Sequence, residues 1–147
     1  MVNWQKIAID DLRKYEHMKQ GLLSIREKQA ALDLQSGVIR SSFSDREPVS
    51  GSGGSGAEDR LISNIVERER LDGNYHAVKK LVAQIDAALA MLDDQERLVL
   101  ERFYINRCPG YVDRLREELG YEVRNIYKIK DAALKKFTIS MYGLIEL

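Results

Sequence analysis

Side chains that can form hydrogen bonds with nucleic acids gather near the carboxyl-terminal end of the chain. The candidates are Arg124, Asn125, Tyr127, Lys128, Lys135 and Lys136. Arginine, asparagine and lysine are the residue types that distinguish base edges in the major groove. From Glu122 to Phe137 the chain has five Lys or Arg and two Asp or Glu, whereas the whole chain has 23 of each. This local positive charge predicts a nucleic-acid-binding face, with Arg124, Asn125 and Lys128 on bases and Lys135 and Lys136 on phosphates.

Two short helices around a tight turn would have to position these side chains. Apolar residues recur at spacings of three and four between Tyr111 and Leu119, which predicts a helix there. Pro109-Gly110 blocks that helix on its amino-terminal side, and Gly120 suits the left-handed turn that ends it. We therefore expect a first helix over Tyr111–Leu119.

The second helix is expected from about Glu122 to Phe137. Its apolar positions are Ile126, Ile129, Ala133 and Phe137. Glu122 stands where the helix is capped, and Glu is a weak cap although its charge suits a helix amino terminus. Two such helices around a turn are typical of a helix-turn-helix, whose second helix lies in the major groove of DNA.

The same residues carry a resemblance to a known family. Leu119-Gly120, Tyr121, Ile126, Ile129, Ala133-Leu134, Lys135-Lys136 and Phe137 follow one another as in region 4 of sigma-70-type sigma factors. Asp94–Tyr104 resembles the first helix of that region. The wider layout, with Arg46–Val49 before a Gly/Ser run and Met141–Gly143 near the end, resembles the ArpU-like late-gene regulators of phages and prophages. The resemblance implies DNA binding and transcription regulation, and it allows contact with RNA polymerase.

The remainder of the chain predicts a long helical hairpin, so that the expected fold class is all-α. We expect an N-terminal helix within residues 1–40, a flexible Gly/Ser linker loop at 41–57, a second long helix at 58–92 and the helix-turn-helix region at 93–147. Asp72-Gly73-Asn74 predicts a kink or break in the second helix. A heptad seam follows the break and consists of Tyr75, Val78, Val82, Ile85, Leu89 and Leu92.

Enzymatic chemistry finds no support in the sequence. His17 and His76 lack metal-spaced neighbours, so that no metal site is expected, and Cys108 has no nearby histidine to make it a nucleophile. The Gly/Ser run lacks the Lys-Ser/Thr that follows a phosphate-binding loop. No cofactor is expected. One cysteine and the lack of a membrane-length apolar run predict a protein of the reducing cytoplasm with no membrane partner.

These features predict a non-catalytic regulator that binds double-stranded DNA as a homodimer. The Val82–Leu89 part of the seam either joins two copies or forms an internal core, and we expect it to join two copies because an isolated hairpin exposes apolar surface. One alternative is a DNA-packaging initiator similar to a small terminase subunit. The other is a helical adaptor that binds protein and no DNA. A ring of many copies would favour the first, and absence of salt-dependent DNA binding would favour the second.

Overall fold

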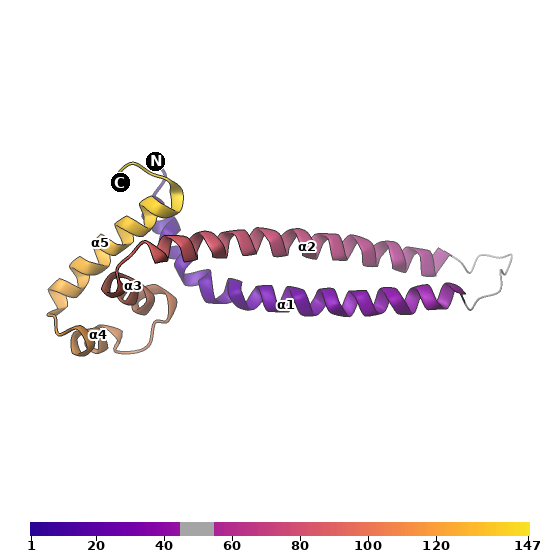
Figure 1. Cartoon of the computed structure of the whole chain (residues 1–147), viewed down its shortest axis with the longest axis horizontal. Helices are drawn as coiled ribbons and strands as arrows, with labels where there is room; N and C mark the ends of the chain where they lie inside the picture. Colours follow the sequence, from indigo (N-terminus) through magenta and orange to yellow (C-terminus); the bar gives the residue numbers. More distant parts are fainter. Residues whose placement is uncertain (45–54) are drawn as a thin grey trace. The chain divides into compact units, whose positions relative to one another are not determined.

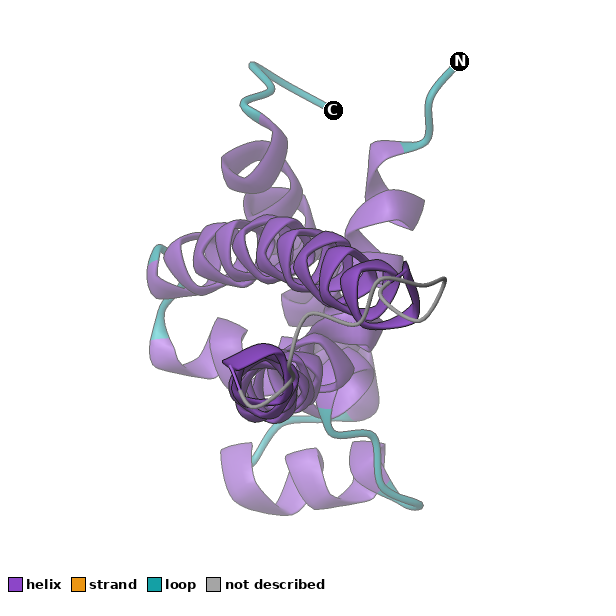
Figure 2. Ribbon diagram, turned by 90° about the vertical axis from the view of Figure 1, so that its right-hand side faces the viewer, coloured by secondary structure: helices purple, strands orange, loops and turns teal. Residues whose placement is uncertain are grey.

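The structure is a computed structural model that describes residues 1–44 and 55–147 of the chain. Within these ranges the chain is all-helical and has no strand, which confirms the expected fold class (Figures 1 and 2). The elements are α1 (Trp4–Ser44), α2 (Ser55–Ala90), α3 (Asp94–Leu100), the π-helix η1 (Glu101–Ile105), α4 (Tyr111–Leu119) and α5 (Val123–Tyr142). None of the described helices is long and apolar enough to cross a membrane.

The ends of the two long helices differ from the sequence-based boundaries. Helix α1 continues to Ser44, past the expected end at residue 40, and α2 begins at Ser55 instead of residue 58. The central part of the expected linker, residues 45–54, lies outside the described residues.

Helix α2 is continuous through Asp72-Gly73-Asn74, so the expected kink or break was wrong. A mid-helix glycine costs about 1 kcal/mol relative to alanine. Packing on both sides of Gly73 outweighs this cost, because Leu71 is buried and the Arg26 guanidinium of α1 lies 3.7 Å from the ring centroid of Tyr75.

The chain divides into two compact units, and the first is formed by Gln20–Lys79. In it α1 and α2 run side by side in opposite directions (Figure 1). Buried Asn64 of α2 donates hydrogen bonds to the Leu32 carbonyl (2.9 Å) and to Gln35 Oε1 (3.3 Å) of α1. Arg68 of α2 pairs with Asp33 of α1 at 3.2 Å. A polar layer therefore crosses the seam between the helices and sets their register, as buried polar residues do in coiled coils.

The second unit consists of Met1–Lys19 and Lys80–Leu147. Its core includes buried apolar residues from all six helical elements and from the turn after α2: Ala8, Leu12, Val82, Ile85, Leu89, Leu92, Val99, Leu100, Phe103, Leu115, Ile126, Ala133, Leu134 and Phe137. Tyr15 of α1 donates a hydrogen bond to Asp86 of α2, and Tyr142 of α5 donates one to Asp11 of α1 at 2.6 Å. Within this unit, polar contacts thus join the first part of α1 to the last part of α2 and to α5.

The part of the heptad seam from Val82 to Leu92 lies inside this core and not on a free surface. Ile85 is fully buried, and Val82 and Leu89 are each 8 % exposed within a single chain. The expectation that this part of the seam joins two copies was therefore wrong. Tyr15 of α1 contacts Asp86 in this part of α2, and Arg97 of α3 donates a hydrogen bond to the Leu89 carbonyl. Other segments of the same chain thus lie against this part of α2, which a pattern along one helix cannot reveal.

Helices α3, α4 and α5 pack against one another through a small core. It consists of Val99, Phe103, Leu115 and Ile126, with partly buried neighbours that include Tyr104, Tyr111 and Ile129. Helix α3 begins with a capping box, in which Asp93 accepts from the Glu96 amide at 2.7 Å and Glu96 accepts from the Asp93 amide. The π-helix η1 extends α3 and ends with the Asn106 amide bonded to the Glu101 carbonyl at 2.7 Å.

Candidate nucleic-acid interface

Two glycine residues set the bounds of α4 and so determine where α5 begins. Gly110 and Gly120 flank α4 with φ values of 73° and 72°, in the left-handed region that favours glycine. The Gly120 amide donates to the Arg116 carbonyl at 2.8 Å and ends the helix there. Both the break at Gly110 and the turn at Gly120 confirm the sequence-based prediction. The long side chain of Arg116 is exposed and points its guanidinium to Asp113 at 3.7 Å, so it does not obstruct the packing of α4 on α5.

One turn of α5 is anchored in the core and thereby orients the residues around it. Ile126 is fully buried against Val99, Phe103 and Leu115. Because residues on the opposite side of a helix point away from its buried face, this anchor directs neighbouring side chains to the surface.

The three residues expected to contact bases all lie on that surface. Arg124, Asn125 and Lys128 are exposed. Throughout the part of the chain that the structure describes, they form no side-chain hydrogen bond or ion pair. Arg124 and Lys128 are four residues apart, so they share one helix face. Their donors are therefore available to an external acceptor.

Tyr127 joins this surface to the aromatic core. Its ring is 42 % exposed and packs edge-on against Phe103, with ring centroids 5.5 Å apart and planes at 83°. Phe103 also packs edge-on against Tyr111 of α4, with centroids 4.9 Å apart. Edge-to-face contacts of this kind favour one ring orientation. Tyr127 therefore combines a supported ring with a partly exposed surface beside Arg124 and Lys128.

Lys130 is a further basic residue of α5, beside Tyr127, that the sequence pattern did not predict to be functional. Its ammonium pairs with Asp131 at 2.6 Å and lies over the rings of Tyr127 and Phe103, 5.6 and 5.8 Å from their centroids. Burial opposes the charged form of Lys130, but the hydrogen bond to Asp131 and the negative charge of Asp131 favour it, and the pKa of Lys130 is raised. The pairing neutralises the carboxylate of Asp131 on the exposed face. The Tyr127–Lys130 spacing of three residues was the only signal for this contact in the sequence.

Lys135 and Lys136 differ in their surroundings, although the sequence assigned both to phosphates. Lys135 is exposed and has no ion-pair partner among the described residues. Lys136 instead pairs with Glu96 of α3 at 2.8 Å, and that bond raises the pKa of Lys136. The Glu96 side chain is only 10 % exposed and belongs to the α3 capping box. Lys136 thus connects α5 to the start of α3, which favours a structural role over contact with phosphate.

The turn between α4 and α5 carries the opposite charge. Asp113, Arg116, Glu117, Tyr121 and Glu122 line a hollow of about 610 Å³ there. Asp113 is paired with Arg116, whereas Glu117 and Glu122 have no ion-pair partner in the described ranges. Glu122 occupies the N-cap position of α5 without a side-chain hydrogen bond. A polyanion is therefore attracted to the Arg124–Lys128 side of α5 and repelled by the turn.

In residues 1–44 and 55–147, no three His, Cys, Asp or Glu side chains lie close enough together to bind a metal ion.

Comparison with protein-family models, with curated proteins and with solved structures finds no match. What the chain does must therefore be inferred from α5, its neighbours and the surfaces of the two units.

Proposed function

We propose that the chain is a non-catalytic, sequence-specific DNA-binding protein that regulates transcription. Helices α4 and α5 with the Gly120 turn act as a helix-turn-helix, and α5 enters the major groove. The observation that carries this proposal is the free state of Arg124, Asn125 and Lys128 at the start of a helix whose other side is anchored by buried Ile126. Exposed donors on a rigid support are what direct readout of base edges requires.

The difference between the unpaired basic residues of α5 and the paired Lys136 supports insertion of α5 into the major groove. Arg124, Asn125 and Lys128 contact bases, Tyr127 packs beside them, and Lys135 contacts a phosphate farther along α5. Lys136 remains on Glu96 and holds α5 against α3. The resemblance to sigma region 4 and to ArpU-like regulators adds a phage or prophage setting to this proposal. In that setting the protein recruits RNA polymerase to late genes from a nearby site, or contacts the polymerase directly.

Selection of bound sequences from random double-stranded DNA tests the proposal directly. The full chain should enrich a defined sequence, and its affinity for that sequence should fall with salt as phosphate-bound counterions are released. A small number of phosphate contacts predicts a shallow slope, with log K changing by about 0.9 per contact per tenfold change in salt. Absence of both enrichment and salt-dependent binding would remove DNA from the function.

A protein-binding adaptor is the second candidate, and one observation favours it. Ile62 and Val66, four residues apart on α2 in the Gln20–Lys79 unit, are 59 and 58 % exposed. Large exposed apolar side chains in groups mark protein contacts. The same selection experiment separates the candidates, because an adaptor would retain protein binding and enrich no DNA.

A further inference from the structure

One exposed face of α5 carries three cations and a single carboxylate. Arg124, Lys128, Asp131 and Lys135 are all exposed and follow one another at spacings of four, three and four, so they lie on the same side of the helix. We name this side the reading face. Asp131 is the only acidic residue of α5. A carboxylate in this position would either repel DNA or accept a hydrogen bond from a base.

A partly buried cation holds the Asp131 carboxylate in place. Lys130 Nζ lies 2.6 Å from Asp131 Oδ1, and the Lys130 side chain is 18 % exposed whereas that of Asp131 is 70 % exposed. The same ammonium lies over the rings of Tyr127 and Phe103. Contacts with two rings restrict the ammonium to a small region. One oxygen of an exposed carboxylate is therefore fixed from below by a supported charge.

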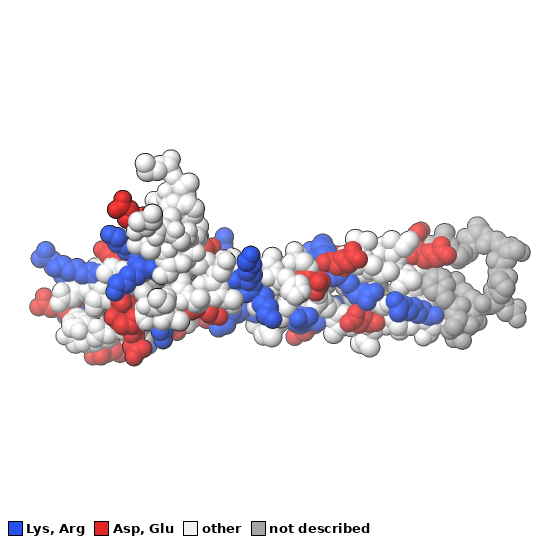
Figure 3. All heavy atoms as spheres, turned by 45° about the horizontal axis from the view of Figure 1, so that its top comes forward, with Lys and Arg blue, Asp and Glu red and all other residues white. Residues whose placement is uncertain are grey.

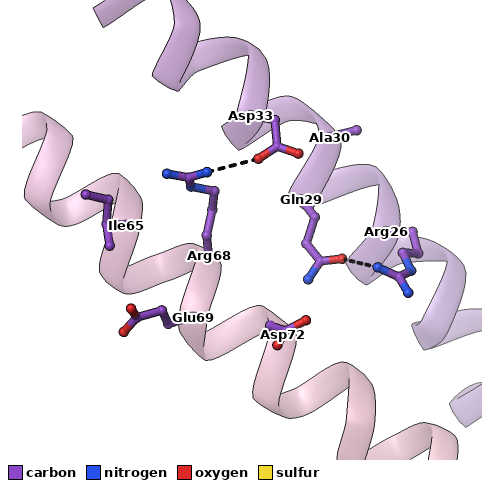
Figure 4. Close-up of a pocket in the computed structure, with 8 residues that line it drawn as sticks. All are labelled: Arg26, Gln29, Ala30, Asp33, Ile65, Arg68, Glu69 and Asp72. Carbon is purple, nitrogen blue, oxygen red and sulfur yellow. Dashed lines mark hydrogen bonds and ion pairs between the residues drawn. The ribbon is translucent and has the colours of Figure 1, made fainter. Parts of the chain in front are cut away.

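The bond between Lys130 and Asp131 differs from the ion pairs that join helices. In the groove between α1 and α2, which is lined mainly by charged and polar side chains, Arg68 of α2 binds Asp33 of α1 (Figure 4). Acidic and basic side chains are interspersed all along this helix pair (Figure 3). Lys130 and Asp131 are instead adjacent residues of one helix. Their bond joins no two elements, and what it fixes is the direction of the Asp131 carboxylate.

The chemistry of a carboxylate limits the base that it can recognise. An ionised carboxylate only accepts hydrogen bonds, and Asp131 Oδ2 has no partner among the described residues. In the major groove, cytosine presents the N4 amino donor and no acceptor, whereas adenine presents its amino group beside the N7 acceptor. Guanine and thymine present acceptors there, which would repel a carboxylate. Cytosine is therefore the base whose edge suits Asp131.

We propose that Asp131 accepts a hydrogen bond from the N4 amino group of a cytosine in the bound site, and that Lys130 is the positioning residue that orients its carboxylate. This inference rests on the proposed DNA-binding function and adds a specificity-determining residue to it. The ammonium of Lys130 also offsets the repulsion between the carboxylate and the phosphates, so that the reading face keeps its attraction for DNA.

Selection from random double-stranded DNA, carried out with the full chain and its Asp131 variants, tests this assignment. The wild-type chain should enrich a site with cytosine at one position, and Asp131→Ala should reduce the preference for that cytosine by about tenfold. Asp131→Asn should shift the same position toward adenine, because an amide both donates and accepts as adenine N6 and N7 require. Both variants should keep the helical circular dichroism, since the side chain is exposed.

Asp113→Ala is the matched control for the loss of one negative charge. Asp113 is likewise an exposed aspartate paired with a basic residue, Arg116 at 3.7 Å, but it belongs to α4. Its removal changes the net charge of the chain as Asp131→Ala does. Base preferences of Asp113→Ala should nevertheless equal those of the wild type at every position.

Lys130→Met tests the positioning role. Methionine keeps an unbranched side chain against Tyr127 and Phe103 but removes the ammonium. It should reduce the preference for the same cytosine, and it should reduce it no further when Asp131 is already alanine. Lys130→Arg should restore part of the preference, since a guanidinium also binds a carboxylate. An equal loss of affinity for all sequences, with the cytosine preference intact, would overturn this role.

Three results would overturn the assignment of Asp131. The first is tighter binding of Asp131→Ala to all sequences with unchanged preferences, because the carboxylate then only repels DNA. The others are unchanged affinity and preferences, and a changed preference for a base other than cytosine. In each case the wild-type chain still enriches a site, so the proposed function stands. Absence of enrichment by the wild-type chain would instead remove the proposed function together with this inference.

Discussion

Arg124 and Lys136 show how residues of similar charge on one helix take different roles. Arg124 has no partner in the described chain, whereas Lys136 forms an ion pair with a mostly buried carboxylate. A free charge can bind a ligand at no cost to the fold, but a paired one must first give up its partner. In the proposed function, recognition therefore falls to Arg124, whereas Lys136 supports α5 through Glu96.

Substitution of Arg124 by alanine should weaken binding to the selected DNA site by about 1–3 kcal/mol and relax the preference at one base position. The fold should be unaffected, because the side chain is exposed and contacts no described residue through a hydrogen bond or ion pair. Fluorescence anisotropy with the selected site and with single-base variants measures both effects. Unchanged affinity and unchanged preference would exclude Arg124 from the interface.

Lys135→Ala and Lys136→Ala form a matched pair of neighbouring substitutions. Lys135→Ala should weaken all DNA sequences alike and reduce the salt slope by about one unit, since it removes one phosphate contact. Lys136→Ala should lower the melting temperature because it leaves Glu96 without its cation, and the salt slope should stay the same. Anisotropy at several salt concentrations, combined with thermal denaturation, distinguishes the two. A sequence-selective loss from Lys135→Ala would mean that α5 docks differently.

At the scale of elements, the position of α5 depends on how α4 ends. Glycine adopts the left-handed backbone angles of Gly120 without the strain that a Cβ would bring, and the Gly120 amide completes the last turn of α4. The π-helix η1 carries Phe103, which packs edge-on against α4 and α5 through Tyr111 and Tyr127. The start of α5 is therefore held from two directions, by the turn and by the aromatic contacts.

Gly120→Ala should destabilise the fold by about 1–2 kcal/mol, because alanine is strained at a φ of 72°. Gly73→Ala should instead stabilise it by about 0.4–1 kcal/mol, since Gly73 lies within continuous α2 and an added Cβ would meet no atom within 4 Å. Urea denaturation of both variants measures the changes. Equal effects of the two alanines would contradict the assignment of Gly120 to a left-handed turn.

At the scale of the whole molecule, α1 and α2 each take part in two compact units that use different faces and different residues. Lys80–Ala90 of α2 packs in the unit that contains α3, α4 and α5, whereas Ser55–Lys79 packs against α1 in the other unit. Ile85 is buried in the unit that contains α3, α4 and α5, whereas Ile62 is exposed in the Gln20–Lys79 unit. A charged substitution should therefore reduce the stability of the fold at Ile85 but leave it nearly unchanged at Ile62, although both are isoleucines of α2.

Ile85→Asp should unfold the chain, with a loss of at least about 3 kcal/mol, because it places an unpaired carboxylate in a fully buried position. Circular dichroism with urea denaturation measures the loss. Ile62→Glu should leave the same curve nearly unchanged at low protein concentration. A folded monomer of Ile85→Asp would contradict the internal packing of the seam and restore it as an interface between copies.

Local patterns in the sequence determined the helical class, the break at Gly110, the turn at Gly120 and the exposed basic residues of α5. Each of these depends on spacing within one helix or on the backbone freedom of glycine, both of which are local. The tertiary structure alone decided that α2 is continuous through Gly73, that Ile85 is buried within one chain and that Lys136 forms an ion pair with Glu96. Those outcomes depend on partners from distant segments, and a helix pattern identifies an apolar or charged face without identifying what covers it.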